Sequence, residues 1–168
     1  WKMGKKISID SANLMNKVLE VIEASLIFNL PINKFKIIIH PQALIHAVVE
    51  FKNGLSSMLY HYNDMKIPIA NSLYNNFYNY KNNDHEFLYQ NQLTFIKANS
   101  KKNPSLKILN LKNVLNENGF ILINALNEIL VQKFLKNKIT FPDITNKLIG
   151  ILNTNIVKNY LKNHQIRH

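Results

Sequence analysis

Residues 1–24 read WKMGKKISIDSANLMNKVLEVIEA and contain the first long helix that the sequence predicts. Polar and apolar residues alternate over residues 6–9, which predicts a short strand. Asp10 and Ser11 are favoured at helix N-caps, and a helical pattern runs from them to about Phe28. At about 100° per residue, one broad apolar face of this helix holds Leu14, Met15, Val18, Leu19, Val21, Ile22 and Leu26.

Polar side chains gather near the predicted start of this helix. Ser11, Asn16 and Lys17 could bind a phosphate, because a helix N-terminus offers free backbone N–H groups and the positive end of the helix dipole. Glu20, one turn further on, could hold a hard divalent cation through its oxygens. The same residues also suit a capped surface helix on which Lys17 and Glu20 form a weak ion pair.

The following segment predicts strands. Residues 34–40 are rich in β-branched side chains and end at a proline. Residues 43–51 and 55–62 flank Asn53-Gly54, a pair typical of a hairpin turn. His40 and His46 fall on adjoining strand ends, where a histidine is more often structural than catalytic.

The second half of the chain predicts helices. Residues 71–103 are rich in Asn, Tyr and Lys with little periodicity, which indicates a linker with a short helix at its start. Pro104 suits a helix N1 position, and Gly119 suits the C′ stop of that helix. The predicted helices span residues 105–118, 120–136, 143–152 and 156–163.

These elements predict an α+β fold, with a helix and a mainly antiparallel sheet followed by a C-terminal helical bundle. We expect three regions: residues 1–74 as the distal part of a catalytic domain, residues 75–103 as a linker, and residues 104–168 as a helical domain.

Composition excludes several classes of protein. The chain of 168 residues has no cysteine, which excludes disulfides, thiolate metal sites and cysteine nucleophiles. It has no apolar run long enough for a transmembrane helix. A net charge of +11 would suit nucleic acid, but only one of the 21 basic residues, Arg167, is an arginine. With 27 asparagines beside many Lys and Ile residues, we expect the charge to reflect an AT-rich bacterial genome rather than a nucleic-acid partner.

Several motifs resemble the 1-deoxy-D-xylulose-5-phosphate reductoisomerase family. Residues 1–24 are similar to its W-x-M-G-x-K-I-x-x-D-S-A-T-x-M-N-K-G-L-E-x-I-E-A, and residues 39–46 (IHPQALIH) to its I-H-P-Q-S-x-I-H. Residues 64–70 (DMKIPIA) resemble D-M-R-x-P-I-A. Shorter matches follow at Leu93-Thr-Phe95, Asn124-Ala-Leu-Asn-Glu128 and Phe141-Pro-Asp-Ile144.

The chain departs from the family pattern in places. Val18 replaces a glycine, residues 61–63 replace Gly-x-Pro, and Lys66 replaces an arginine. After Asn153 we recognise no similarity to the family.

The resemblance implies an enzyme that converts 1-deoxy-D-xylulose 5-phosphate to 2-C-methyl-D-erythritol 4-phosphate, with NADPH and Mg²⁺, Mn²⁺ or Co²⁺. This is an early step of non-mevalonate isoprenoid synthesis, and the family is homodimeric. The implied setting is the cytoplasm, with no membrane or nucleic-acid partner. The family's Gly-rich dinucleotide fingerprint, on a Rossmann-like sheet, has no match here. We therefore expect a C-terminal fragment that begins in the loop closing over the active site and is inactive alone.

The resemblance also implies residue roles. Substrate would be bound by Ser11, Asn16, Lys17 and Glu20. Glu20 would also hold the metal and take part in catalysis with Trp1 and His46. NADPH would contact Met3 and Gly4 in the closing loop.

Two other functions stay open. A basic nucleic-acid-binding module that kept the fold would show steep salt dependence of binding. A decayed remnant of the enzyme would show poor folding of its full-length product.

Overall fold

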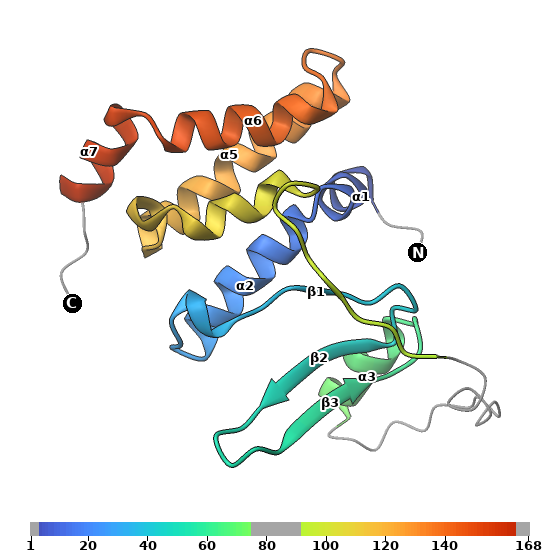
Figure 1. Cartoon of the computed structure of the whole chain (residues 1–168). Coiled ribbons are helices and arrows are strands. Elements are labelled where there is room, and N and C mark those ends of the chain that lie inside the picture. The colour runs from blue at the N-terminus through green and yellow to red at the C-terminus, as the bar shows by residue number, and fades with distance from the viewer. Residues whose placement is uncertain (1–3, 75–91, 164–168) are drawn as a thin grey trace. The chain divides into compact units, whose positions relative to one another are not determined.

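The computed structural model describes residues 4–74 and 92–163 (Figure 1). The chain divides into two compact units. The helical unit comprises Lys2–Ile37 and Ala98–His168, and the strand unit comprises Ile38–Lys97. Within the described ranges, no helix has the length and apolar character needed to cross a membrane.

The helical unit begins with two helices, α1 (Lys5–Ala12) and α2 (Met15–Ile27). The prediction of a strand at residues 6–9 is wrong, because these residues form part of α1. Lys6 and Asp10, one helical turn apart, form an ion pair of 2.7 Å, and Ile9 joins the hydrophobic core. A helix satisfies both contacts, whereas a strand would place Lys6 and Asp10 too far apart to pair.

The prediction that Asp10 and Ser11 cap one long helix is also wrong. Both residues lie in the last turns of α1, and a two-residue turn of Asn13 and Leu14 separates the two helices. The Asn13 side-chain oxygen accepts a hydrogen bond of 2.9 Å from the backbone N–H of Met15. Leu14 has a left-handed backbone with φ of 60°. Leucine rarely adopts this conformation, so the sequence does not predict a turn at this position.

The apolar face predicted for this region is largely confirmed. Met15, Val18, Val21 and Ile22 of α2 are buried, whereas Leu26 is exposed. Burial of Val18 shows that the side chain standing in place of the family's glycine packs inside the helical unit.

After residue 98 the helical unit contains 3₁₀ and α-helical segments. The 3₁₀ segments are η2 (Pro104–Asn110) and η3 (Lys112–Val114), and a third, η1 (Ile32–Lys34), follows α2. The α-helices are α5 (Glu117–Leu135), α6 (Phe141–Leu152) and α7 (Asn155–Asn163). The three α-helices match the predictions at 120–136, 143–152 and 156–163 to within three residues at each end.

The helix predicted at 105–118 with Gly119 as its stop is wrong. Most of this segment is 3₁₀ structure in η2 and η3, and Gly119 lies in the first turn of α5, which begins at Glu117. Its N–H donates a 2.9 Å hydrogen bond to the side-chain oxygen of Asn116, the N-cap of α5. A Cβ at Gly119 would lie 2.2 Å from the carbonyl oxygen of Val114, so glycine is needed for close packing rather than for a helix end.

One hydrophobic core joins the helices of this unit, and α5 lies beside α6 (Figure 1). Its buried members come from α1, α2, η2, η3, α5, α6 and α7: Ile9, Met15, Val18, Ile22, Ile108, Val114, Ile123, Leu130, Val131, Ile144, Leu148, Leu152 and Leu161.

The described residues of the strand unit form two small antiparallel sheets. β1 (Ile38–Ile39) pairs with β4 (Ile96–Lys97). β2 (Ile45–Glu50) pairs with β3 (Ser56–Tyr60) as the predicted hairpin, with an irregularity between Ile45 and Ala47. The strand predicted at 34–40 is wrong in extent: only Ile38–Ile39 form β1, Lys34 ends η1, and residues 35–37 belong to neither element.

A short helix, α3 (Lys66–Leu73), overlaps the start of the segment 71–103, where a short helix was predicted, but it begins five residues earlier. The expectation of an α+β chain with antiparallel sheets and a helical bundle is confirmed. The expected division at residues 74 and 103 stays a prediction.

Candidate active site

The junction between α1 and α2 holds most of the predicted site residues. Ser11 lies in the last turn of α1, Asn16 and Lys17 lie in the first turn of α2, and Glu20 follows one turn later. The sequence predicted these residues on one helix, and the structure places them on two helices joined at Asn13-Leu14.

Lys17 and Glu20 form the ion pair that the sequence allowed. The Lys17 ammonium donates to both carboxylate oxygens of Glu20, at 2.8 and 3.1 Å. Their side chains are 45% and 53% exposed, so solvent screens the pair and either group can turn toward a ligand.

Asn16 adds a polar atom that the described protein leaves unsatisfied. Its side-chain oxygen is buried and has no hydrogen-bond partner among the described residues. A buried acceptor without a donor is unfavourable, and a ligand hydroxyl or a water molecule would satisfy it. The first turn of α2 therefore combines an unpartnered acceptor, a cation at Lys17 and the positive end of a helix dipole.

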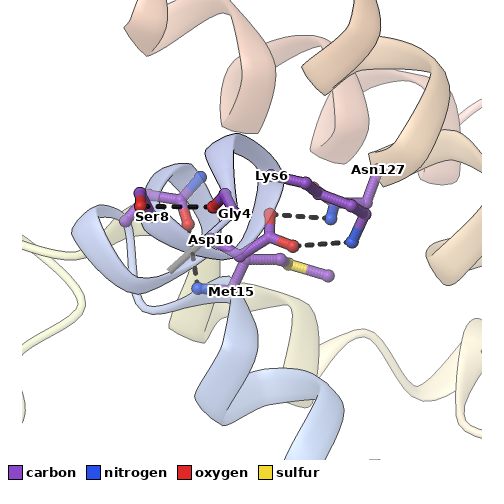
Figure 2. Close-up of polar contacts among 7 residues, drawn as sticks. Gly4, Lys6, Ser8, Asp10, Met15 and Asn127 are labelled. Atoms are coloured by element: carbon purple, nitrogen blue, oxygen red, sulfur yellow. Dashed lines mark hydrogen bonds and ion pairs between the residues drawn. The ribbon is translucent and has the colours of Figure 1, made fainter. Parts of the chain in front are cut away.

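A buried polar contact that sequence reasoning missed lies directly before Ser11. The carboxylate of Asp10 accepts hydrogen bonds from the Lys6 ammonium at 2.7 Å and from the Asn127 side-chain amide at 2.9 Å (Figure 2). Asp10 is only 3% exposed and Asn127 is fully buried. The i,i+4 spacing of Lys6 and Asp10 was the one local signal for this arrangement, since Asn127 lies 117 residues from Asp10.

Gly4 is exposed at the N-cap of α1, where its carbonyl accepts from the backbone N–H and the hydroxyl of Ser8. A Cβ at Gly4 would meet no atom within 4 Å, so the described protein itself does not require glycine there. Trp1 and Met3, the other predicted members of the closing loop, lie outside the described residues.

His46 belongs to the strand unit, on β2. Its ring stacks on that of His61 with centroids 3.7 Å apart, and its Nε2 lies 3.2 Å from the His61 carbonyl oxygen. His40 Nδ1 lies 2.8 Å from the Thr94 carbonyl oxygen, and its ring stacks on Phe95. Both histidines thus have structural partners.

The residues that the structure describes supply at most part of a metal site. No three or more His, Asp or Glu side chains among them come together as a metal-binding group. A hard cation such as Mg²⁺ takes about six oxygen ligands, and Glu20 provides one carboxylate. Glu20 alone could therefore contribute one ligand to such an ion, and the described residues do not complete a set around it.

Two family models match the chain. Residues 61–167 match the model described as DXP reductoisomerase C-terminal domain. Residues 1–28 match the 1-deoxy-D-xylulose 5-phosphate reductoisomerase C-terminal domain. Because the first match continues to residue 167, the sequence-based view that similarity ends at Asn153 is wrong.

Known relatives extend beyond the length of this chain. It is 47% identical over 157 residues to the 1-deoxy-D-xylulose 5-phosphate reductoisomerase of Pelagibacter ubique, covering 92% of this chain and 40% of that protein. The chain therefore spans about 40% of the length of such a relative.

Solved structures show the same likeness. The Zymomonas mobilis enzyme in complex with NADPH aligns with a TM-score of 0.79 and 32% identity, covering 94% of this chain and 44% of that one. A DOX-P reductoisomerase in complex with NADPH, fosmidomycin and magnesium aligns with a TM-score of 0.79 and 34% identity, covering 96% and 40%.

Proposed function

The chain belongs to the 1-deoxy-D-xylulose 5-phosphate reductoisomerase family, and on this basis we propose that it forms the substrate-binding part of such an enzyme. The reaction converts 1-deoxy-D-xylulose 5-phosphate to 2-C-methyl-D-erythritol 4-phosphate in non-mevalonate isoprenoid synthesis. The observation that carries the proposal is the α1–α2 junction, with Ser11 in the last turn of α1 and Asn16 and Lys17 in the first turn of α2.

These three residues suit a phosphorylated sugar. The Lys17 ammonium can leave its exposed partner Glu20 and make a charge-assisted hydrogen bond to a phosphate oxygen. The Ser11 hydroxyl can donate to the same group, and the unpartnered Asn16 oxygen can accept from a substrate hydroxyl. The dipole of α2 favours the negative charge at this end.

Glu20, His46, Trp1, Met3 and Gly4 take the remaining roles in this proposal. Glu20 supplies one oxygen ligand to a divalent cation, Mg²⁺, Mn²⁺ or Co²⁺, which when bound stabilises negative charge on substrate oxygens. His46 assists near the reacting group, with Trp1 in the loop that excludes water. Met3 and Gly4 contact NADPH in that loop. The Zymomonas mobilis relative, solved with NADPH, supports the choice of nucleotide.

We further propose that the active protein includes a dinucleotide-binding region like the part of the relatives that this chain does not span, and that the chain alone is inactive.

We expect the active protein to be a cytoplasmic homodimer. Exposed apolar side chains on the β2–β3 hairpin, among them Val49 and Leu59, support self-association. Light scattering would give twice the protomer mass, and a monomer mass would contradict this. Cell fractionation would place the protein with the soluble proteins, and recovery with membranes would contradict that.

A chimera tests the function. Residues 1–168 would replace the matching segment of the Pelagibacter ubique relative, and NADPH oxidation would be followed with 1-deoxy-D-xylulose 5-phosphate and Mg²⁺. We expect turnover that EDTA abolishes, and none from the chain alone. A folded chimera without turnover would contradict the proposal.

Lys17→Ala in that chimera should raise the KM for substrate about 10- to 100-fold, the range for a lost hydrogen bond to a charged group. Lys133→Ala removes an exposed lysine from α5 and is the matched control, which should leave the KM within about twofold. Equal effects of the two variants on the KM would show that Lys17 does not bind the substrate.

A further inference from the structure

The carboxylate of Asp10 is held from two directions within the helical unit. Its Oδ2 accepts from Lys6 on the same helix, and its Oδ1 accepts from the Asn127 side chain on α5 (Figure 2). Both of its oxygens therefore have a partner, and Asp10 is 3% exposed. A buried carboxylate with both oxygens bonded is fixed in position, because leaving either oxygen unpaired is unfavourable.

Asn127 is held through its side-chain nitrogen and its burial, while its side-chain oxygen has no hydrogen-bond partner among the described residues. It is 0% exposed, and on α5 it lies one turn from the buried Ile123 and Val131, which belong to the core. Its Nδ2 donates to Asp10 across 117 residues of sequence, so the pair ties the end of α1 to the middle of α5. The α5 side of this contact cannot shift without disturbing the core.

The residues after Asp10 are those assigned to the substrate. Ser11 is its neighbour in the chain, and the turn at Asn13 and Leu14 follows. That turn is closed locally by the bond from the Met15 N–H to the Asn13 side chain, and Val18 N–H donates to the Leu14 carbonyl. Core packing of Met15, Val18 and Ile22 orients α2, and the Asp10–Asn127 contact adds a polar bond that holds the end of α1 from which the turn leads.

We propose that Asp10 and Asn127 are positioning residues, whose buried carboxylate–amide pair holds the α1–α2 junction in the geometry by which Ser11, Asn16 and Lys17 bind the phosphorylated substrate. This inference rests on the proposed function. Neither residue touches substrate, and both act through the position of the junction.

A matched control is available in the same unit. Ser105 of η2 and Thr145 of α6 form a buried hydroxyl hydrogen bond of 3.2 Å. Thr145→Val removes this buried polar contact, as Asn127→Leu removes the contact to Asp10. Both variants should lower the thermal stability of the chain, since each leaves one buried group unpaired.

The first readout is the amide spectrum of the full chain by nuclear magnetic resonance. Asn127→Leu should shift the amide signals of residues 11–17, whereas Thr145→Val should leave them in place. This readout needs no enzyme activity, so it decides the positioning role even where the chimera is inactive. Unmoved signals of residues 11–17 in Asn127→Leu would overturn the proposal.

The second readout is the split between kinetic constants in the chimera. Asn127→Leu should raise the KM for 1-deoxy-D-xylulose 5-phosphate at least about tenfold and leave the KM for NADPH within about twofold. Thr145→Val should change neither KM. A substrate KM for Asn127→Leu within about twofold of wild type would make the pair purely structural. An inactive parent chimera would instead count against the proposed function.

Exchanging the carboxylate and the amide between positions 10 and 127 provides a test that does not depend on the folding of Asn127→Leu. Asn127→Asp places two carboxylates together, whereas the double variant Asp10→Asn with Asn127→Asp restores one carboxylate and one amide. We expect the double variant to recover the amide positions of residues 11–17 at least in part. If Asn127→Leu does not fold, the comparison of Asn127→Asp with the double variant decides, and absence of any recovery would overturn the proposal.

Discussion

The two units of the chain differ in how they hold their residues. The helical unit has one continuous core of buried side chains from α1, α2 and the helices after residue 98, and it carries the α1–α2 junction. In the described part of the strand unit, Leu44 is the one buried apolar residue, and hairpin side chains such as Val49 and Leu59 are at least half exposed. The proposed substrate site, which needs fixed geometry, belongs to the unit whose own packing can supply it.

The largest expected effect is a loss of catalytic rate with both units still folded. Glu20→Gln in the chimera should lower kcat about a thousandfold, the order of a lost electrostatic contact at an active site, because an anionic metal ligand is removed. Its side chain is 53% exposed, so the free energy of unfolding should stay within about 0.5 kcal/mol. Glu117→Gln, an exposed residue at the start of α5, is the control and should leave kcat unchanged. Equal kcat values for the two variants would show that Glu20 is not part of the proposed active site.

The next prediction measures the difference in packing directly. Ile123→Ala removes a fully buried side chain of the helical unit and should lower the free energy of unfolding by about 2–5 kcal/mol. Val49→Ala on β2, where the valine is 50% exposed, should change it by less than about 0.5 kcal/mol. Urea unfolding of the full chain measures both. A Val49 effect as large as that of Ile123 would mean that the hairpin is covered in solution.

Alanine substitutions at two glycines test the packing of the helical unit. Gly119→Ala should destabilise the chain by about 1–3 kcal/mol, because the new Cβ would lie 2.2 Å from the Val114 carbonyl oxygen. Gly150→Ala, inside α6 with no atom within 4 Å of the added Cβ, should stabilise it by about 0.5–1 kcal/mol. Urea midpoints that move in the same direction for both would contradict this packing.

The smallest effect concerns the start of α6. The Thr140 N–H and hydroxyl both donate to Asp143, and these bonds hold the pKa of that carboxyl below its ordinary value. A carboxyl whose pKa is lowered on folding stabilises the fold at neutral pH, and this contribution is lost as the pH falls through the folded pKa, below about pH 4. Asp143→Asn should therefore be less stable than wild type at pH 7 and converge with it at low pH. A constant difference across that range would contradict the assignment.

The sequence predicted elements whose cause is local. The β2–β3 hairpin follows from Asn53-Gly54, where Gly54 has φ of 87°, and α6 begins where Thr140 and Asp143 bond to each other. The hairpin was predicted from its turn, whereas the start of α6 was placed at residue 143, two residues late, because the Thr140–Asp143 cap was not used.

The errors have causes that the pattern of residue types does not show. Residues 6–9 alternate like a strand, yet they lie in α1, where Lys6 pairs with Asp10 one turn later and Asp10 also accepts from the distant Asn127. Gly119 resembles a helix stop, yet its role is to approach Val114 closely. The Asp10–Asn127 contact could not be found from local pattern, since it joins residues far apart in sequence.

For the site, the polar residues Ser11, Asn16, Lys17 and Glu20 could be selected from the sequence, and the family resemblance gave them roles. Their distribution over two helices could not be predicted, because it depends on a left-handed Leu14 that carries no sequence signature.

The most direct test of the central claim is a crystal structure of the chimera with 1-deoxy-D-xylulose 5-phosphate bound. We predict that the phosphate lies at the start of α2, with its oxygens within about 3 Å of the Ser11 hydroxyl and the Lys17 ammonium. A phosphate bound away from the α1–α2 junction would contradict it.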